Sequence, residues 1–244
     1  IIIKTIDFRD ADKLVTIFSE QKGKIRAVAK GTKKPNSSLR ACVQPFAHSF
    51  LSLSQRRELG IITQGKVLDF YGNIRDNLDL SLSTVYIMEL LDKSLLENVP
   101  LPRLYYNTLQ VLNILNTKEI DYNPILIRYY EMSLLEELGY KPILNHCVIC
   151  KNTDGLNYIS ISHGGTICSK CSSQNRYNIY ISGESIAILR LLTKANVNTL
   201  FRVKPSAKAR HQIELVLERY LEYHLERRFK VKDTIRKLKE GLAR

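Results

Sequence analysis

Four of the five cysteines fall into two Cys-x-x-Cys pairs, and this spacing constrains the fold of the 244-residue chain more than any other feature. The pairs are Cys147 with Cys150 and Cys168 with Cys171, and seventeen residues separate them. One tight turn can present both sulfurs of a pair to one ion, and two such turns complete a tetrahedron. Because four thiolates fill the coordination sphere of Zn²⁺, we predict a structural zinc site without an open position for substrate.

Other uses of these cysteines agree less well with the sequence. A redox pair would need one Cys-x-x-Cys in a βαβ context. A zinc deaminase would need His-x-Glu before the pairs, whereas His224-Leu225-Glu226 follows them. His146 and His163 could replace a thiol, but with four thiols present we expect them to be loop residues. Gly164-Gly165 suits a tight turn before the second pair.

Positive charge is concentrated near the start of the chain. The formal net charge is +13, which favours an anionic partner such as nucleic acid or a membrane surface. Residues 21–57 contain nine basic side chains and no acidic one, although a solvated face usually mixes both signs. The nine are Lys22, Lys24, Arg26, Lys30, Lys33, Lys34, Arg40, Arg56 and Arg57.

The first eighty residues show the pattern of short strands. Segments 13–18 and 24–29 flank a turn at 21–23, and further strands are predicted at 46–53, 59–64 and 66–70. About five short strands without a crossover helix favour a small closed barrel.

Helical spacing replaces the strand pattern after residue 72. Pro124 opens one predicted helix, which Gly139 and Pro142 end, and Ser182 and Ser206 are predicted to cap two more. The basic tail 227–244 is a further short helix by this pattern. The sequence therefore predicts an α+β protein with a barrel at 1–79 and a helical domain at 80–244, interrupted by a zinc module at 143–181.

The sequence contains no motif that demands an enzyme. A Walker A loop, a dinucleotide fingerprint and a Gly-x-Ser-x-Gly elbow are all absent from it. The sequence also lacks a run of apolar residues long enough to span a membrane, and its first residues do not resemble a secretory signal. Clustered, odd-numbered cysteines suit a reducing compartment, so we expect a cytoplasmic protein, which would be nucleoid-associated if its anionic partner is DNA.

Four segments, in their order and spacing, resemble the bacterial RecO recombination mediator family. The first is Gly-Lys-Ile-Arg-Ala-Val-Ala-Lys-Gly at 23–31, and the second is Ser-Leu-Arg at 38–40 with Gln-Pro-Phe at 44–46. The third is Leu-Gly-Tyr-Lys-Pro at 138–142, which leads into the four cysteines. The fourth is Arg-Tyr-Leu-Glu-Tyr-His-Leu-Glu-Arg at 219–227.

The resemblance implies an N-terminal OB-fold barrel, a helical C-terminal domain and the zinc-binding insertion of a subset of the family. It also implies a non-enzymatic mediator that binds single- and double-stranded DNA and anneals complementary strands. With a RecR partner, such a protein helps to load a RecA-type recombinase onto DNA coated by single-stranded-DNA-binding protein.

A basic barrel face would neutralise phosphates, so binding should weaken steeply with salt and show little sequence preference. The residues expected to do so are Lys24, Arg26, Lys30, Lys33, Lys34 and Arg40, then Arg56, Arg57 and Lys66. Phe46, Phe50 and Tyr71 could stack on bases, although alternating strand residues more often form the core.

The basic C-terminal segment has two possible uses. Arg227, Arg228, Lys230 and Lys232 could extend the DNA track or bind the acidic C-terminal tail of single-stranded-DNA-binding protein. That tail needs an apolar groove rimmed by cations. Two alternatives to a mediator remain open from the residues alone, a zinc-dependent hydrolase or nuclease and a membrane-surface protein.

Overall fold

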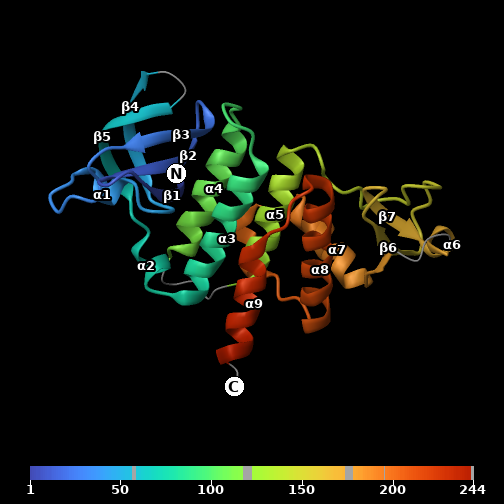
Figure 1. Cartoon of the computed structure of the whole chain (residues 1–244). Helices are drawn as coiled ribbons and strands as arrows, with labels where there is room; N and C mark the ends of the chain where they lie inside the picture. The colour runs from blue at the N-terminus through green and yellow to red at the C-terminus, as the bar shows by residue number, and fades with distance from the viewer. Residues whose placement is uncertain (57–58, 118–122, 174–177, 195, 243–244) are drawn as a thin grey trace. The chain divides into compact units, whose positions relative to one another are not determined.

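The computed structural model describes the chain except for residues 57–58, 118–122, 174–177, 195 and 243–244 (Figure 1). The chain forms two compact units. Unit 1 comprises residues 1–120 and 229–244, and unit 2 comprises residues 121–228.

Unit 1 contains a five-stranded sheet in the strand order β1-β2-β3-β5-β4. Its strands are β1 (Ile2–Phe8), β2 (Asp12–Ser19), β3 (Gly23–Ala29), β4 (His48–Arg56) and β5 (Leu59–Asp69). Strands β3 and β5 pair in parallel, and the other neighbours pair antiparallel. The predicted hairpin around residues 21–23 is confirmed by the β2–β3 register, in which Ser19 pairs with Gly23.

The core of the sheet follows from the alternation of side chains along its strands. On β3, Ile25 and Ala27 face inward and are buried, whereas Arg26 between them is exposed. The short helix α1 (Leu39–Cys42) adds Leu39 and Cys42 to the same cluster. The sequence around it is therefore divided between apolar positions that build the core and charged positions that remain on the surface.

Two details of the strand prediction are wrong. Strand β1 is missing from it, and β5 continues through Gly65, where the pattern suggested a break between two strands. The sheet is also not a fully closed barrel, because no ladder joins β1 to β4 among the described residues. Two backbone hydrogen bonds partly close this gap, from Ile2 N–H to the Ala47 carbonyl (3.0 Å) and from Phe46 N–H to the Ile2 carbonyl (2.7 Å).

Helices complete unit 1. They are α2 (Gly72–Arg75), α3 (Leu78–Ser94), α4 (Pro102–Leu115) and α9 (Lys230–Leu242). The N-terminus of α9 docks on α3, where the Glu89 carboxylate accepts from the N–H groups of Lys230 and Val231, each at 2.9 Å. The C-terminal helix thus returns to the unit that contains the start of the chain (Figure 1).

Unit 2 is a helical body with a small sheet. Its helices are α5 (Ile125–Glu137), α6 (Ser169–Ser172), α7 (Gly183–Leu192), the 3₁₀ helix η1 (Val197–Arg202) and α8 (Ala207–Leu225). Strands β6 (Leu156–Ser160), β7 (Gly165–Cys168) and β8 (Ile179–Tyr180) form the sheet in the order β7-β6-β8. The predicted caps are confirmed, since the side chains of Ser182 and Ser206 accept from the N–H groups of Ser185 and Ala209.

Candidate metal centre and nucleic-acid interface

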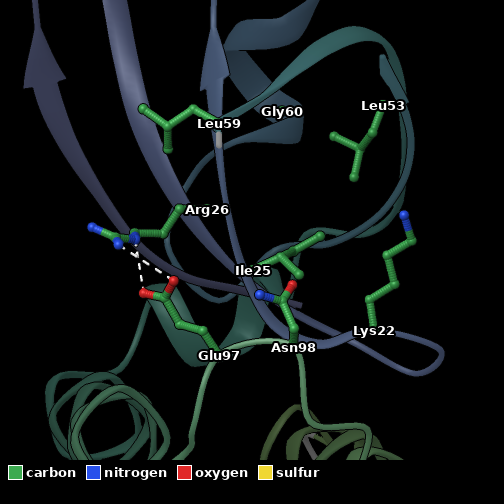
Figure 2. Close-up of a pocket in the computed structure, with 8 residues that line it drawn as sticks. All are labelled: Lys22, Ile25, Arg26, Leu53, Leu59, Gly60, Glu97 and Asn98. Carbon is green, nitrogen blue, oxygen red and sulfur yellow. Dashed lines mark hydrogen bonds and ion pairs between the residues drawn. The ribbon is translucent and has the colours of Figure 1, made fainter. Parts of the chain in front are cut away.

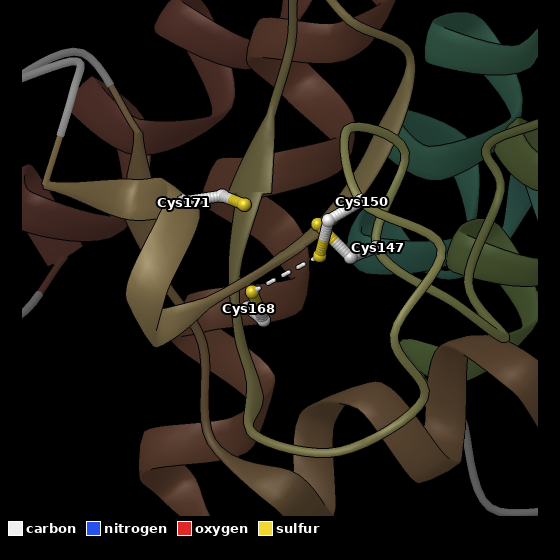
Figure 3. A group of neighbouring side chains, drawn as sticks. All are labelled: Cys147, Cys150, Cys168 and Cys171. Carbon is white, nitrogen blue, oxygen red and sulfur yellow. Dashed lines mark hydrogen bonds between the residues drawn. The ribbon is translucent and has the colours of Figure 1, made fainter.

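The structure gathers the four paired cysteines of unit 2 into one cluster (Figure 3). Their Sγ atoms all lie within 4.8 Å of one another, and Cys150 and Cys168 are 3.7 Å apart. A tetrahedron with Zn–S bonds of about 2.3 Å has sulfur–sulfur edges of about 3.8 Å. The cluster can therefore hold one metal ion with small adjustments of the side chains.

The first cysteine pair lies on a tight turn of the backbone. Lys151 N–H donates to the Cys147 carbonyl at 2.9 Å, and Cys147 N–H donates to the Asn152 carbonyl at 2.7 Å. Lys151 has a positive φ of 64°, which folds the chain back after the second thiol. The loop can therefore present both sulfurs to the same point.

The second cysteine pair is positioned by β7 and α6. Gly165 begins β7 directly beside Ile143, where a Cβ atom would overlap the Ile143 carbonyl oxygen. That oxygen accepts from Thr166 N–H at 2.8 Å, and Gly164 before it has a φ of 72°. The two glycines are thus required by a close backbone approach and by a left-handed turn, as the sequence predicts.

The thiols of the cluster interact electrostatically. Burial opposes ionisation of Cys147, but backbone N–H groups, among them that of Cys150, lower its pKa to about 6. Hydrogen bonds with the thiols of Cys150 and Cys168 raise the pKa of Cys171 to about 12. Four thiolates this close repel one another, and a divalent cation would stabilise all of them together.

The two histidines near the cysteines do not belong to this cluster. His163 Nδ1 lies 2.9 Å from Ser160 Oγ, and the metal-ligating group found in the described part of the chain consists of the four cysteines. A four-thiolate sphere has no open position for a water molecule. The site is therefore suited to bracing the backbone and not to activating water.

The predicted DNA contacts fall into two groups at opposite ends of β3. Lys24 and Arg26 lie on its first half, next to the connection between α3 and α4. Lys24 Nζ donates to the Asp92 carbonyl at 2.7 Å, and Arg26 Nε lies 2.8 Å from Glu97 Oε1. These two cations are engaged by unit 1 itself.

A pocket of about 290 Å³ lies beside this first group (Figure 2). Ile25, Leu53 and Leu59 give it apolar walls, and the Arg26–Glu97 pair borders it. The acidic partner of Arg26 comes from a segment seventy-one residues away. Glu97 is not predictable from the sequence, because nothing in the local pattern indicates which distant carboxylate meets a strand cation.

The second group surrounds the loop after β3. Arg40 donates to the carbonyls of Lys33 and Lys34, both at 3.0 Å, so that its guanidinium shapes the loop. Lys33 Nζ lies 3.1 Å from Asp7 Oδ2. Lys30 and Lys34 are exposed, and no ion pair is recorded for either within the described ranges. This loop end, defined by Lys30, Lys33 and Lys34, is a cationic surface that carries three of the nine predicted contacts, with Asp7 and Asp12 beside it.

The remaining candidates have different positions. Lys66 is exposed on β5, opposite Phe50 of β4. Phe46 and Tyr71 are buried, with 7% and 0% exposure, whereas Phe50 is 66% exposed. Arg57 lies outside the described residues, and for Arg56 the structure describes only the backbone at the end of β4.

The C-terminal basic residues are partly used for packing. Lys232 is 5% exposed, and its Nζ lies 5.1 Å from the centre of the Tyr86 ring. Lys230 is exposed at the start of α9, next to Phe229, which packs edge-on against Tyr86 at 6.4 Å. This part of the segment therefore anchors α9 to α3.

Comparison with known proteins settles the family. The model of the recombination protein O N-terminal part matches residues 1–71, and that of its C-terminal part matches residues 75–233. The chain belongs to the RecO family. Membership in RecO places the protein in DNA repair and recombination, in a family named for DNA repair and not for an enzymatic activity.

Relatives of the RecO family match nearly the whole chain. DNA repair protein RecO of Syntrophomonas wolfei is 52% identical over 244 residues, which cover 100% of this chain and 97% of that protein. The protein of the same name from Desulforamulus reducens is 31% identical over 250 residues, covering 100% and 95%. The one from Bacillus subtilis is 32% identical over 223 residues, covering 91% and 86%.

None of the helices in the described part of the chain is both long and apolar enough to cross a bilayer.

Proposed function

We propose that the protein binds DNA as a non-enzymatic recombination mediator. The observation that carries this proposal is the match to both parts of the RecO family over almost the entire chain. A net charge of +13 and the cationic loop end support binding to phosphates.

The proposed DNA-binding residues differ in their roles, since some contact phosphates directly and others support the fold. Lys30, Lys33 and Lys34 on the loop end, together with Lys66, make direct contacts, while Arg40 supports the loop conformation. Arg56 and Arg57 are proposed as further contacts from their sequence alone, since Arg57 lies outside the described residues. Lys24 and Arg26 contribute through the stability of unit 1, because both already have partners there.

Binding to labelled oligonucleotides tests this proposal over a range of about 50 to 300 mM salt. Each phosphate contact contributes a slope of about +0.7 to log Kd against log salt for single strands. The double change Lys30→Glu and Lys34→Glu should lower affinity for all sequences alike and flatten that slope. Lys208→Glu is the matched control, since Lys208 is an exposed lysine on α8. A salt-independent affinity of the unmodified protein would contradict the proposal.

The mediator role adds three activities to DNA binding. The protein anneals complementary strands, acts with RecR, and through it helps to load a RecA-type recombinase onto DNA covered by single-stranded-DNA-binding protein. It recognises the acidic C-terminal tail of the latter protein through cations beside apolar side chains. Annealing of two labelled strands, measured with and without RecR and with tail-truncated single-stranded-DNA-binding protein, tests these steps separately.

The ion proposed for the cysteine cluster is Zn²⁺. Four thiolates at tetrahedral spacing suit Zn²⁺. Mg²⁺ and Ca²⁺ prefer oxygen ligands to soft thiolates, which disfavours them at this site. We expect one Zn²⁺ per chain by elemental analysis and a four-sulfur charge-transfer spectrum after replacement by Co²⁺. A metal with oxygen or water ligands would instead support the zinc-dependent hydrolase or nuclease.

A further inference from the structure

One aromatic side chain on the sheet of unit 1 points away from the core. Phe50 lies between Ser49 and Leu51 on β4, and Leu51 packs inward against the core cluster. Because successive side chains on a strand alternate, Phe50 faces outward, and 66% of it is exposed.

The surroundings of Phe50 are polar and cationic. Lys66 is its direct cross-strand neighbour, and the next outward pair in register is Ser52 with Gln64. No ion pair is recorded for Lys66 in the part of the chain that the structure describes. From residue 49 to residue 68 the sequence contains one acidic residue, Glu58, which lies outside the described residues.

Two neighbouring apolar side chains, Leu68 and Phe70, are also partly exposed. The Arg75 guanidinium lies 3.9 Å from the ring centre of Phe70, which is 41% exposed, and 4.0 Å from that of Phe46. Leu68 is 54% exposed at the irregularity where β5 pairs with the start of β4. The cations beside these side chains are Lys66 and Arg75, and lysine is depleted at protein interfaces, so the Lys66 ammonium group favours a phosphate as the partner of this face.

We propose that Phe50 and Lys66 form a base-stacking site for single-stranded nucleic acid. The ring offers a face to an unpaired base, and the ammonium group beside it meets the adjacent phosphate. Paired bases in a duplex are stacked on one another and cannot offer their faces, so the site selects single strands. This inference rests on the proposed DNA binding. Within that function, Phe50 and Lys66 would be the residues that distinguish single from double strands.

The absence of tryptophan from the chain allows a direct test. Phe50→Trp introduces one fluorophore at the proposed site, and Leu96→Trp introduces one at a residue of unit 1 that is 74% exposed on the connection between α3 and α4. We expect an oligothymidylate to quench the fluorescence of Phe50→Trp and to leave that of Leu96→Trp unchanged. A duplex of equal phosphate content should not quench either variant. Equal responses of the two variants would overturn the proposal.

Affinity provides the second measurement. Phe50→Ala should weaken binding to single strands about 5- to 100-fold, the range of one lost stacking contact, and change duplex binding less than about 2-fold. Phe50→Tyr should restore single-strand affinity, since it keeps the ring. If Phe50→Ala leaves single-strand affinity intact, or instead alters self-association in sedimentation, the stacking site is wrong while DNA binding through the loop end stands. Loss of DNA binding by the unmodified protein would instead contradict the proposed function.

Discussion

At the scale of single residues, Gly23 is a position where only glycine fits. Its φ is 64°, and a Cβ atom there would overlap the Val99 carbonyl oxygen. Gly23→Ala should therefore destabilise unit 1 by about 2 to 4 kcal/mol, because it adds both backbone strain and a steric clash. Chemical denaturation measures this loss. Gly72→Ala is the control, since a Cβ at Gly72 meets nothing within 4 Å, and a comparable loss there would contradict the explanation.

His224 is a second residue whose environment predicts a measurable effect. Burial lowers the pKa of its imidazole. The rings of Tyr140, Tyr220 and Tyr223 pack around it, and its Nε2 lies 3.1 Å from the carbonyl oxygen of Ile161. A histidine whose folded-state pKa is lowered binds fewer protons folded than unfolded. Its contribution to stability is thus present above about pH 6.5 and is lost as the pH falls.

Thermal melting between about pH 7.5 and 5.5 tests this expectation. His224→Gln should be less stable at the upper pH and should reduce the dependence of the melting temperature on pH. His211→Gln, on the same helix at an exposed position, should leave that dependence unchanged. A pH profile unaffected by His224→Gln would show that other groups account for it.

At the scale of elements, the C-terminal helix α9 depends on a cap from another helix. Glu89 of α3 accepts from two N–H groups at the start of α9, and Lys93 Nζ lies 2.6 Å from its carboxylate. Glu89→Ala should cost about 1 to 2 kcal/mol, because both N–H groups lose a charged acceptor at a helix N-terminus.

Hydrogen exchange locates the effect of Glu89→Ala. Amides at the start of α9 should exchange faster, while those of β2 and β3 keep their protection. Glu136→Ala, which removes an exposed ion pair with Lys141, should cost less than about 1 kcal/mol. Unchanged protection of α9 in Glu89→Ala would mean that Phe229 and Lys232 hold the helix without the cap.

Local sequence signals were sufficient for elements that are stabilised locally. The caps Ser182 and Ser206, the helix opened by Pro124 and the hairpin before Gly23 all depend on residues within one turn of the chain. Strand β1 was missed because its residues alternate poorly, with Ile2 and Ile3 both buried. The break expected at Gly65 does not occur, because that glycine lies close to Cys42 within a continuous strand.

At the scale of the whole molecule, the same distinction separates the metal site from the cationic surface. The spacing of the cysteines predicts the geometry of the four-thiol cluster, because each pair lies on one short turn. The acid-free stretch does not predict which of its cations stay available. Arg26 and Lys33 form ion pairs with Glu97 and Asp7, and Lys24 bonds the main-chain carbonyl of Asp92. Long-range contacts of this kind depend on the assembled fold and leave no trace in local composition.

Metal removal should therefore separate the stabilisation of unit 2 by the ion from DNA binding by unit 1. Cys168→Ser, or treatment with a strong chelator, should lower the metal content and destabilise unit 2, since ion binding is coupled to folding of the turns that supply the thiols. The sheet of unit 1 has its own core of residues such as Val15, Ala27 and Ile62, so that DNA affinity should change less than about 2-fold. Cys42→Ser is the matched control, because Cys42 is a buried thiol of unit 1 and should not alter metal content. If DNA binding collapsed while the circular dichroism of the chain was preserved, the ion would have a direct part in DNA recognition.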